Sequence, residues 1–105
     1  MIAAPVHHVR PPARVQVVAS EFRLTLSRGA VRAGTAIVEL VNMGEDTHDL
    51  KVRRAGGGPT TSWRIVRPGE HVDRRLTLRP GRYVLWCSLP GHRALGMQAV
   101  LVVRR

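Results

Sequence analysis

The chain has 105 residues, 44% of them hydrophobic and 23% charged, which suits one folded domain and excludes a multidomain enzyme. Its 17 Lys and Arg residues outnumber its 7 Asp and Glu residues, and the formal net charge of +10 raises the question of an anionic partner. A single cysteine, Cys87, excludes an intramolecular disulfide and leaves an inert, a reactive or a metal-binding thiol.

Residues 1–13 contain three prolines and no hydrophobic periodicity, which predicts an extended lead-in to a domain over residues 14–105. The chain has no apolar run of about 18 residues that could span a membrane. Its opening residues also lack the long apolar region of a secretory signal. We therefore expect a soluble chain in which no signal or anchor is present.

Runs of strand length dominate the rest of the chain. The clearest is Glu21–Ser27, where polar and apolar residues alternate and place Phe22, Leu24 and Leu26 on one face. The other predicted strands are Val15–Ala19, Ala36–Asn42, Leu50–Arg53, Ser62–Val66, His71–Leu78, Tyr83–Cys87 and Ala99–Val103. About eight short strands separated by Pro-Gly and Gly-rich turns, with no strong amphipathic helix, favour an antiparallel β-sandwich or barrel.

Three potential metal ligands lie close together after the strand that ends in Cys87. The thiol of Cys87, the imidazole of His92 and the thioether of Met97 fall within eleven residues. Sulfur ligands favour Cu(I) and imidazole serves both oxidation states of copper, so this set suits copper better than zinc. A fourth ligand must come from elsewhere, and His48, between two predicted strands, is the best placed of the remaining histidines.

The spacing of these residues resembles that of the cupredoxins, small blue-copper electron carriers. The motifs are Cys87-x4-His92-x4-Met97, Gly81-x-Tyr83-x3-Cys87 and Asn42-x-Gly44-x3-His48. The resemblance covers roughly residues 15–105. It implies an eight-stranded Greek-key sandwich that holds one type 1 copper per chain. It also implies His48, Cys87 and His92 as equatorial ligands and Met97 as the axial ligand.

Residues around the predicted ligands suggest supporting roles. Asp49 stands where many cupredoxins have Asn, and with Ser88 it offers a hydrogen bond between the two ligand-bearing segments. Trp86 replaces the Tyr or Phe common beside the cysteine, and Tyr83 resembles the tyrosine that braces a Greek-key sandwich. Trp63 is expected in the core. An apolar rim near His92 is expected from Leu89, Pro90, Ala94 and Leu95.

The same residues allow other interpretations. A lone cysteine is more often an inert buried thiol, and a lone Met core filler, but the combined spacing favours copper ligation. His7, His8 and His71 are assigned no role. A nitrite reductase or multicopper oxidase needs further histidines for a catalytic copper, and a binuclear centre needs a second cysteine. A copper-storage or delivery protein with the same ligands remains the alternative.

The expected function is one-electron transfer between redox partner proteins outside the cytoplasm, in the periplasm or on the outer membrane face, and not an enzymatic reaction. Sixteen of the 17 basic residues are Arg, scattered along the chain, and aromatic residues are only 4%, so nucleic acid is not expected as a partner. The positive charge instead favours a partner with an acidic docking surface, including a membrane-associated one. The chain is expected to act as a monomer.

Overall fold

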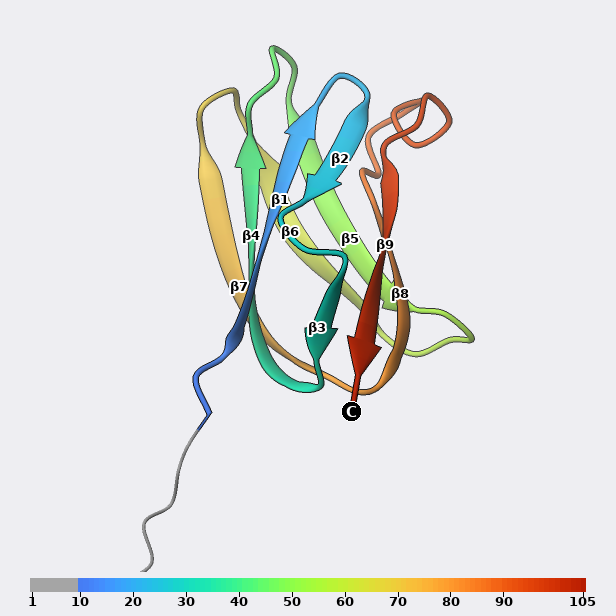
Figure 1. The fold of residues 1–105 in the computed structure, drawn as a ribbon. Helices are drawn as coiled ribbons and strands as arrows, with labels where there is room; N and C mark the ends of the chain where they lie inside the picture. Colours follow the sequence, from blue (N-terminus) through green and yellow to red (C-terminus); the bar gives the residue numbers. More distant parts are fainter. Residues whose placement is uncertain (1–9) are drawn as a thin grey trace, which may run out of the picture.

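Nine β-strands form two sheets in the computed structural model, which describes residues 10–105 (Figure 1). No helix occurs among these residues, so none in the described part of the chain could cross a membrane. The strands are β1 (Ala13–Ser20), β2 (Arg23–Leu26), β3 (Ala30–Arg32), β4 (Gly34–Asn42), β5 (His48–Arg54), β6 (Thr60–Val66), β7 (His71–Leu78), β8 (Gly81–Trp86) and β9 (Gln98–Arg104).

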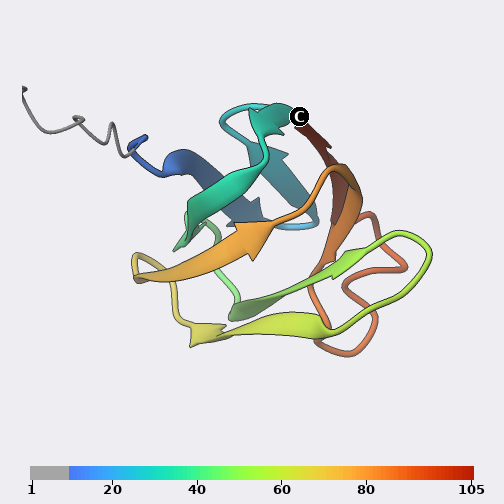
Figure 2. The same cartoon turned by 90° about the horizontal axis from the view of Figure 1, so that it is seen from below.

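The two sheets pack face to face. One has the strand order β2-β1-β4-β7 and the other the order β3-β9-β8-β5-β6, and the view along the strands shows the two layers (Figure 2). Because side chains alternate across a strand, β1 buries Val15, Val17 and Ala19 while Arg14 and Gln16 point to solvent. The predicted all-β sandwich is therefore confirmed.

Two aromatic residues lock the sandwich as the sequence predicts. Trp63 of β6 is 2% exposed, and its Nε1–H donates to the carbonyl oxygen of Val38 on β4 at 2.9 Å, which joins the two sheets. The hydroxyl of Tyr83 accepts from the backbone N–H of Arg79 at 2.9 Å and donates to the carbonyl of the same residue at 3.0 Å. These bonds confirm the core role of Trp63 and the corner role of Tyr83.

The strand predictions need two corrections. Each predicted strand overlaps an observed one, but β3 has only three residues between turn-forming segments and is too short to show an alternating pattern. The expected antiparallel sandwich has mixed sheets, because β1 pairs with β4, and β3 with β9, in parallel. Between β1–β2 and β4 the chain crosses to the other sheet and back, which brings strands of the same direction side by side.

The placement of Phe22 inside a strand is also wrong. Ser20 pairs directly with Arg23, which leaves Glu21 and Phe22 to make the turn between β1 and β2. Phe22 is consequently 36% exposed, while Leu24 is buried as expected. The alternation of polar and apolar residues continues through the turn, so the sequence pattern does not indicate where the turn lies.

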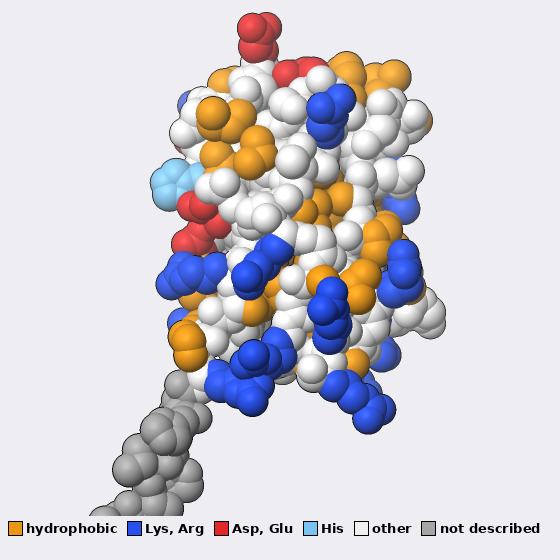
Figure 3. All heavy atoms as spheres, viewed as in Figure 1, with side chains coloured by type: hydrophobic (Ala, Val, Ile, Leu, Met, Phe, Trp, Pro, Cys, Tyr) orange, Lys and Arg blue, Asp and Glu red, His pale blue; other side chains and the backbone are white. Residues whose placement is uncertain are grey.

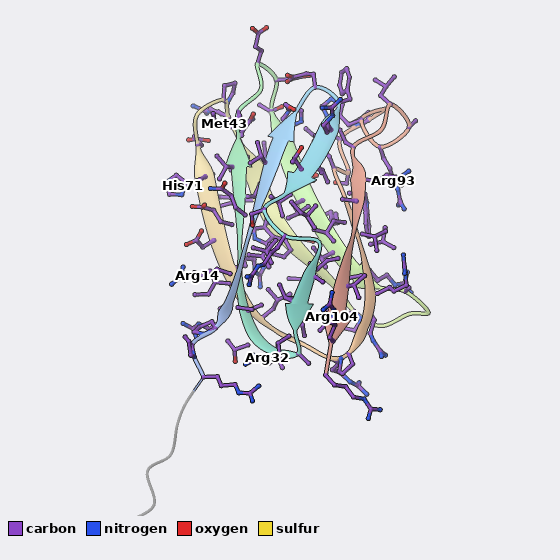
Figure 4. All side chains as sticks on the ribbon, in the orientation of Figure 1. Arg14, Arg32, Met43, His71, Arg93 and Arg104 are labelled. Carbon is purple, nitrogen blue, oxygen red and sulfur yellow. The ribbon has the colours of Figure 1, made fainter. Side chains whose placement is uncertain are left out.

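The β1–β2 turn, the β4–β5 loop, the β6–β7 turn and the β8–β9 loop lie at one end of the sandwich (Figure 1). The C-terminus lies at the other end, where blue basic side chains gather on the face shown in Figure 3, and Arg32 and Arg104 are labelled there in Figure 4. On this face the basic side chains are therefore unevenly distributed. Most of the predicted lead-in, together with His7 and His8, lies outside the described residues.

Candidate metal centre

His48 begins β5 at the loop-rich end of the sandwich, and its side chain is 0% exposed. Its Nε2 lies 3.0 Å from Oε1 of Glu21, whereas its Nδ1 is buried without a hydrogen-bond partner in the described part of the chain. A carboxylate only accepts hydrogen bonds, so Nε2 carries the proton and Nδ1 presents a free lone pair. An unpaired buried nitrogen is costly, and a metal ion at this point would satisfy it.

Glu21, in the β1–β2 turn, accepts hydrogen bonds from backbone groups as well as from His48. Its carboxylate accepts hydrogen bonds from the backbone N–H groups of Asp46 at 2.7 Å and Glu45 at 3.0 Å. These bonds, that of Asp46 foremost, lower the pKa of Glu21 to about 2, although partial desolvation opposes the shift. Gly44 makes the approach possible, since a Cβ there would lie 2.6 Å from the carboxylate oxygens. The first histidine therefore rests against a fixed negative charge.

Cys87 directly follows β8 and is 0% exposed. Its Sγ lies 3.5 Å from Nδ1 of His92, and its backbone N–H donates to the carbonyl of Met97 at 3.1 Å. Burial raises the pKa of the Cys87 thiol, while hydrogen bonds from the backbone N–H groups of Asp49 and Leu89 act in the opposite direction. These donors favour the thiolate, which is the form that binds a metal.

His92 and Met97 come from the loop between β8 and β9. His92 is 9% exposed, its Nε2 lies 3.5 Å from Oδ2 of Asp46, and its ring meets the ring of Phe22 edge to face with centroids 5.1 Å apart. Met97 is 0% exposed, and its backbone N–H donates to the carbonyl of His92 at 3.2 Å. The loop therefore places both residues next to Cys87.

The structure brings the three predicted equatorial ligands together. The ligand atoms of His48, Cys87 and His92 all lie within 4.8 Å of one another, and all three residues are buried. The rings of the two histidines are 5.1 Å apart between centroids. Two imidazoles and a thiol fit a copper ion, and Nδ1 of His48 is buried and has no other partner in the described part of the chain. The buried Met97 lies beside this group.

The predicted hydrogen bond between the two ligand-bearing segments is confirmed. Oδ1 of Asp49 accepts from the backbone N–H of Ser88 at 2.6 Å, and the hydroxyl of Ser88 donates to Oδ2 of the same carboxylate. Asp49 follows His48 and Ser88 follows Cys87. The pair therefore ties the backbone beside one ligand to the backbone beside the other.

Much of the apolar rim expected near His92 is open to solvent. Pro90, Ala94 and Leu95 are exposed, and Leu95 has 62% of its surface accessible. Met43, in the β4–β5 loop, is 70% exposed at the same end of the molecule (Figure 4). Beside this rim the guanidinium of Arg93 lies 4.7 Å from the ring centroid of Trp86.

His71 lies apart from this centre and is exposed, as expected. Its Nδ1 is 3.1 Å from Oε2 of Glu39, and Asp73 completes a second group of close ligand atoms. All three sit on the outward faces of β4 and β7, where such ion pairs are ordinary surface contacts. We assign this group no role in metal binding.

Sequence reasoning missed the contacts of Glu21, Phe22 and Asp46. The sequence pattern places Glu21 and Phe22 in a strand, and Asp46 belongs to the loop before His48 with no recognisable motif. Their contacts with the histidines depend on how the β1–β2 turn meets the β4–β5 and β8–β9 loops. Gly44, part of a motif in the sequence, was the one local signal that a side chain from elsewhere comes close.

Comparison with known proteins identifies the family. Residues 12–104 match the model of the copper binding proteins of the plastocyanin/azurin family. The chain belongs to this family. The resemblance to cupredoxins is thereby confirmed, and with it copper as the metal that the His48, Cys87 and His92 group suits. A search of curated protein sequences finds no match to this cupredoxin.

Solved structures share the cupredoxin fold. Auracyanin from Roseiflexus castenholzii aligns with a TM-score of 0.73 at 19% identity, over 91% of this chain and 100% of its own. Rusticyanin from Thiobacillus ferrooxidans aligns with a TM-score of 0.69 at 16% identity, over 90% of this chain and 79% of its own. Copper nitrite reductase from Nitrosomonas europaea gives 0.66 at 21% identity, over 90% of this chain but only 42% of its own.

Proposed function

We propose that this cupredoxin is a mononuclear blue-copper protein that carries one electron at a time between redox partners. His48, Cys87 and His92 would hold the metal, with Met97 as the weak fourth ligand. Copper, when bound, supplies a Cu(II)/Cu(I) couple. The observation that supports the proposal best is the convergence of three buried ligand atoms within 4.8 Å in a fold of the copper-binding family.

The chain holds its ligands in a way that suits rapid electron transfer. His48 begins β5 and Cys87 follows β8, and these two strands are hydrogen-bonded neighbours in one sheet. The Asp49–Ser88 pair connects the same two segments beyond the ends of the strands. Because the sheet sets the separation of the ligands, little rearrangement is needed when the charge of the site changes.

The exposed edge of His92 is the route that we propose for electrons. Its ring reaches the surface while His48 and Cys87 are fully covered, and Leu95 and Phe22 provide exposed apolar surface nearby. An apolar contact surface allows a partner to approach closely without removing many polar groups from water. The domain over residues 14–105 would present this edge to its partner as a monomer.

We further propose that the partner has an acidic surface and acts outside the cytoplasm, free or membrane-associated. The net charge of +10 supports attraction of an acidic protein, and Arg93 is a basic side chain of the exposed β8–β9 loop. The exposed Glu45 and Asp46 stand at the same end, so the acidic groups of the partner would meet the side of Arg93. A rate of electron transfer that falls with rising salt would support this, and an unchanged rate would argue against it.

An enzymatic role is not proposed. The similar nitrite reductase is more than twice as long as the matched region, and a catalytic copper would need several more histidines. Within residues 10–105 the one further histidine is His71, which lies apart on an outer sheet face. A metal analysis that finds more than one copper per chain would contradict the proposal.

Electron exchange separates the proposed carrier from a copper-storage or delivery protein. Mixing Cu(I)- and Cu(II)-loaded protein, with exchange followed by NMR line broadening, should show fast electron self-exchange. Incubation with an apo-acceptor should leave copper on the chain. Slow exchange together with ready copper transfer would instead identify a delivery protein. Cys87→Ser, which lacks the thiolate, is the control and should lose the exchange.

A further inference from the structure

The carboxylate of Glu21 joins two segments of the site that are far apart in the sequence. It meets Nε2 of His48 at 3.0 Å across 27 positions of the chain, and it also accepts the backbone N–H groups of Glu45 and Asp46. Three donors on one carboxylate fix its position, although its side chain is 31% exposed. The contact with His48 is therefore part of a network and not a chance approach of a mobile side chain.

We propose that Glu21 is a positioning residue for His48 and that its charge lowers the reduction potential of the copper site. By accepting a hydrogen bond from Nε2–H, the carboxylate leaves the lone pair of the buried Nδ1 free for a metal held together with Cys87 and His92. A carboxylate on the far nitrogen of a metal-bound imidazole orients the ring and makes it a stronger donor. The effect on the potential rests on the proposed function, whereas the effect on the imidazole does not.

The sign of the effect follows from charge. A negative group close to the site stabilises Cu(II) more than Cu(I), because the oxidised site carries one more positive charge. The ring of His48 is completely buried, so little solvent lies between it and the carboxylate to weaken the interaction. Glu21 should therefore favour the oxidised form and hold Cu(II) more tightly.

His92 provides an internal comparison. Its Nε2 also faces a carboxylate, Oδ2 of Asp46, but at 3.5 Å, and the side chain of Asp46 is 54% exposed. Water competes for a contact of this length and exposure, so its influence should be smaller. Of the two carboxylates that face a histidine of the centre, Glu21 is consequently the one that we assign to tuning the site; the carboxylate of Asp49 is bonded to Ser88 instead.

Four variants test the proposal. Glu21→Gln keeps an oxygen acceptor and removes the charge, and Glu21→Ala removes both. Gly44→Ala keeps the charge but places a Cβ 2.6 Å from the present carboxylate oxygens, which forces Glu21 away; the backbone of Gly44 is not in the left-handed region. Glu45→Gln is the matched control, because it removes an equal charge from the neighbouring β4–β5 loop without touching a ligand through its side chain.

The copper-loaded proteins give the first readouts. The reduction potential should rise in Glu21→Gln and Gly44→Ala and change little in Glu45→Gln, while the visible band is retained. Glu21→Ala should lose about 10- to 100-fold in Cu(II) affinity, measured by chelator competition. Equal shifts in Glu21→Gln and Glu45→Gln would overturn the tuning role, since a general charge effect would then explain both.

The apoprotein gives a readout that does not depend on electron transfer. The nitrogen chemical shifts of His48 should report the Nε2-protonated tautomer in the wild type and a mixture of tautomers in Glu21→Ala. An Nδ1-protonated His48 in the wild type, or an unchanged tautomer in Glu21→Ala, would overturn the positioning role. These measurements stand even if the copper-loaded chain proves not to carry electrons.

Discussion

The two histidines of the copper centre are held in different ways. His48 begins a strand, is completely buried, and meets a carboxylate that three donors fix in place. His92 comes from a loop, is 9% exposed, and faces the carboxylate of Asp46, which is 54% exposed, at 3.5 Å. One side of the centre is therefore closed and the other is open.

This difference separates two tasks of an electron carrier. In the proposed carrier, the closed side would set the position of the metal, because the sheet and the Glu21 network hold His48. The open side would give electrons a short path to the surface through the ring of His92. A site that was closed on both sides would exchange electrons slowly, and one open on both sides would admit water.

The largest effect is expected when each histidine is replaced by glycine in turn. His92→Gly should lose the visible band and regain it when imidazole is added, because the vacated position opens to solvent. His48→Gly should lose the band and not regain it at the same imidazole concentration, since its position is covered. Absorption spectra of the copper-loaded variants give the result, and equal recovery in both would remove the distinction.

The next test concerns the support of the closed side. Asn42 is 0% exposed, and its side chain bonds the carbonyls of Asp46 and Val66 and the backbone N–H of Gly44. Asn42→Ala should destabilise the apoprotein by about 2–4 kcal/mol in urea denaturation, because each buried polar group left unpaired costs about 1–3 kcal/mol. Gln98→Ala, which removes an exposed amide on the open side, should stay within about 0.5 kcal/mol of wild type. Similar losses in both would contradict the comparison.

The smallest effect is expected from a substitution on the surface of the open side. Leu95→Asp should leave the stability within about 0.5 kcal/mol and the visible band unchanged, because Leu95 is 62% exposed. It should slow electron self-exchange by about tenfold, because a carboxylate in the apolar contact surface would lose water on contact and face the same carboxylate of the other copy. Ile65→Asp, at an exposed position on β6, is the control and should change the exchange rate little. A rate that responds to Ile65 and not to Leu95 would place the contact surface elsewhere.

Spacing along the chain predicts the parts of the site that are local. Cys87, His92 and Met97 share one loop, so their order alone indicates a metal-binding group, and the loop of His48 carries its own motif. The bond between Asp49 and Ser88 could also be predicted, because each follows a ligand directly.

The parts that depend on packing could not be predicted. Glu21 reaches His48 because a two-residue turn displaces it from the strand pattern toward the ligand loops, and alternation of polar and apolar residues continues across that turn. The parallel pairing of β1 with β4 likewise follows from how the chain crosses between sheets. The spacing of residues in the sequence indicates neither the position of the β1–β2 turn nor the crossing of the chain between the sheets.

A spectroelectrochemical titration of the copper-loaded wild type tests the central claim most directly. We predict one copper per chain and an intense visible thiolate-to-Cu(II) band that bleaches on one-electron reduction and returns on reoxidation. The band should be absent from Cys87→Ser at the same copper loading. A colourless wild type at full loading, or a Cys87→Ser variant that keeps the colour, would contradict the account.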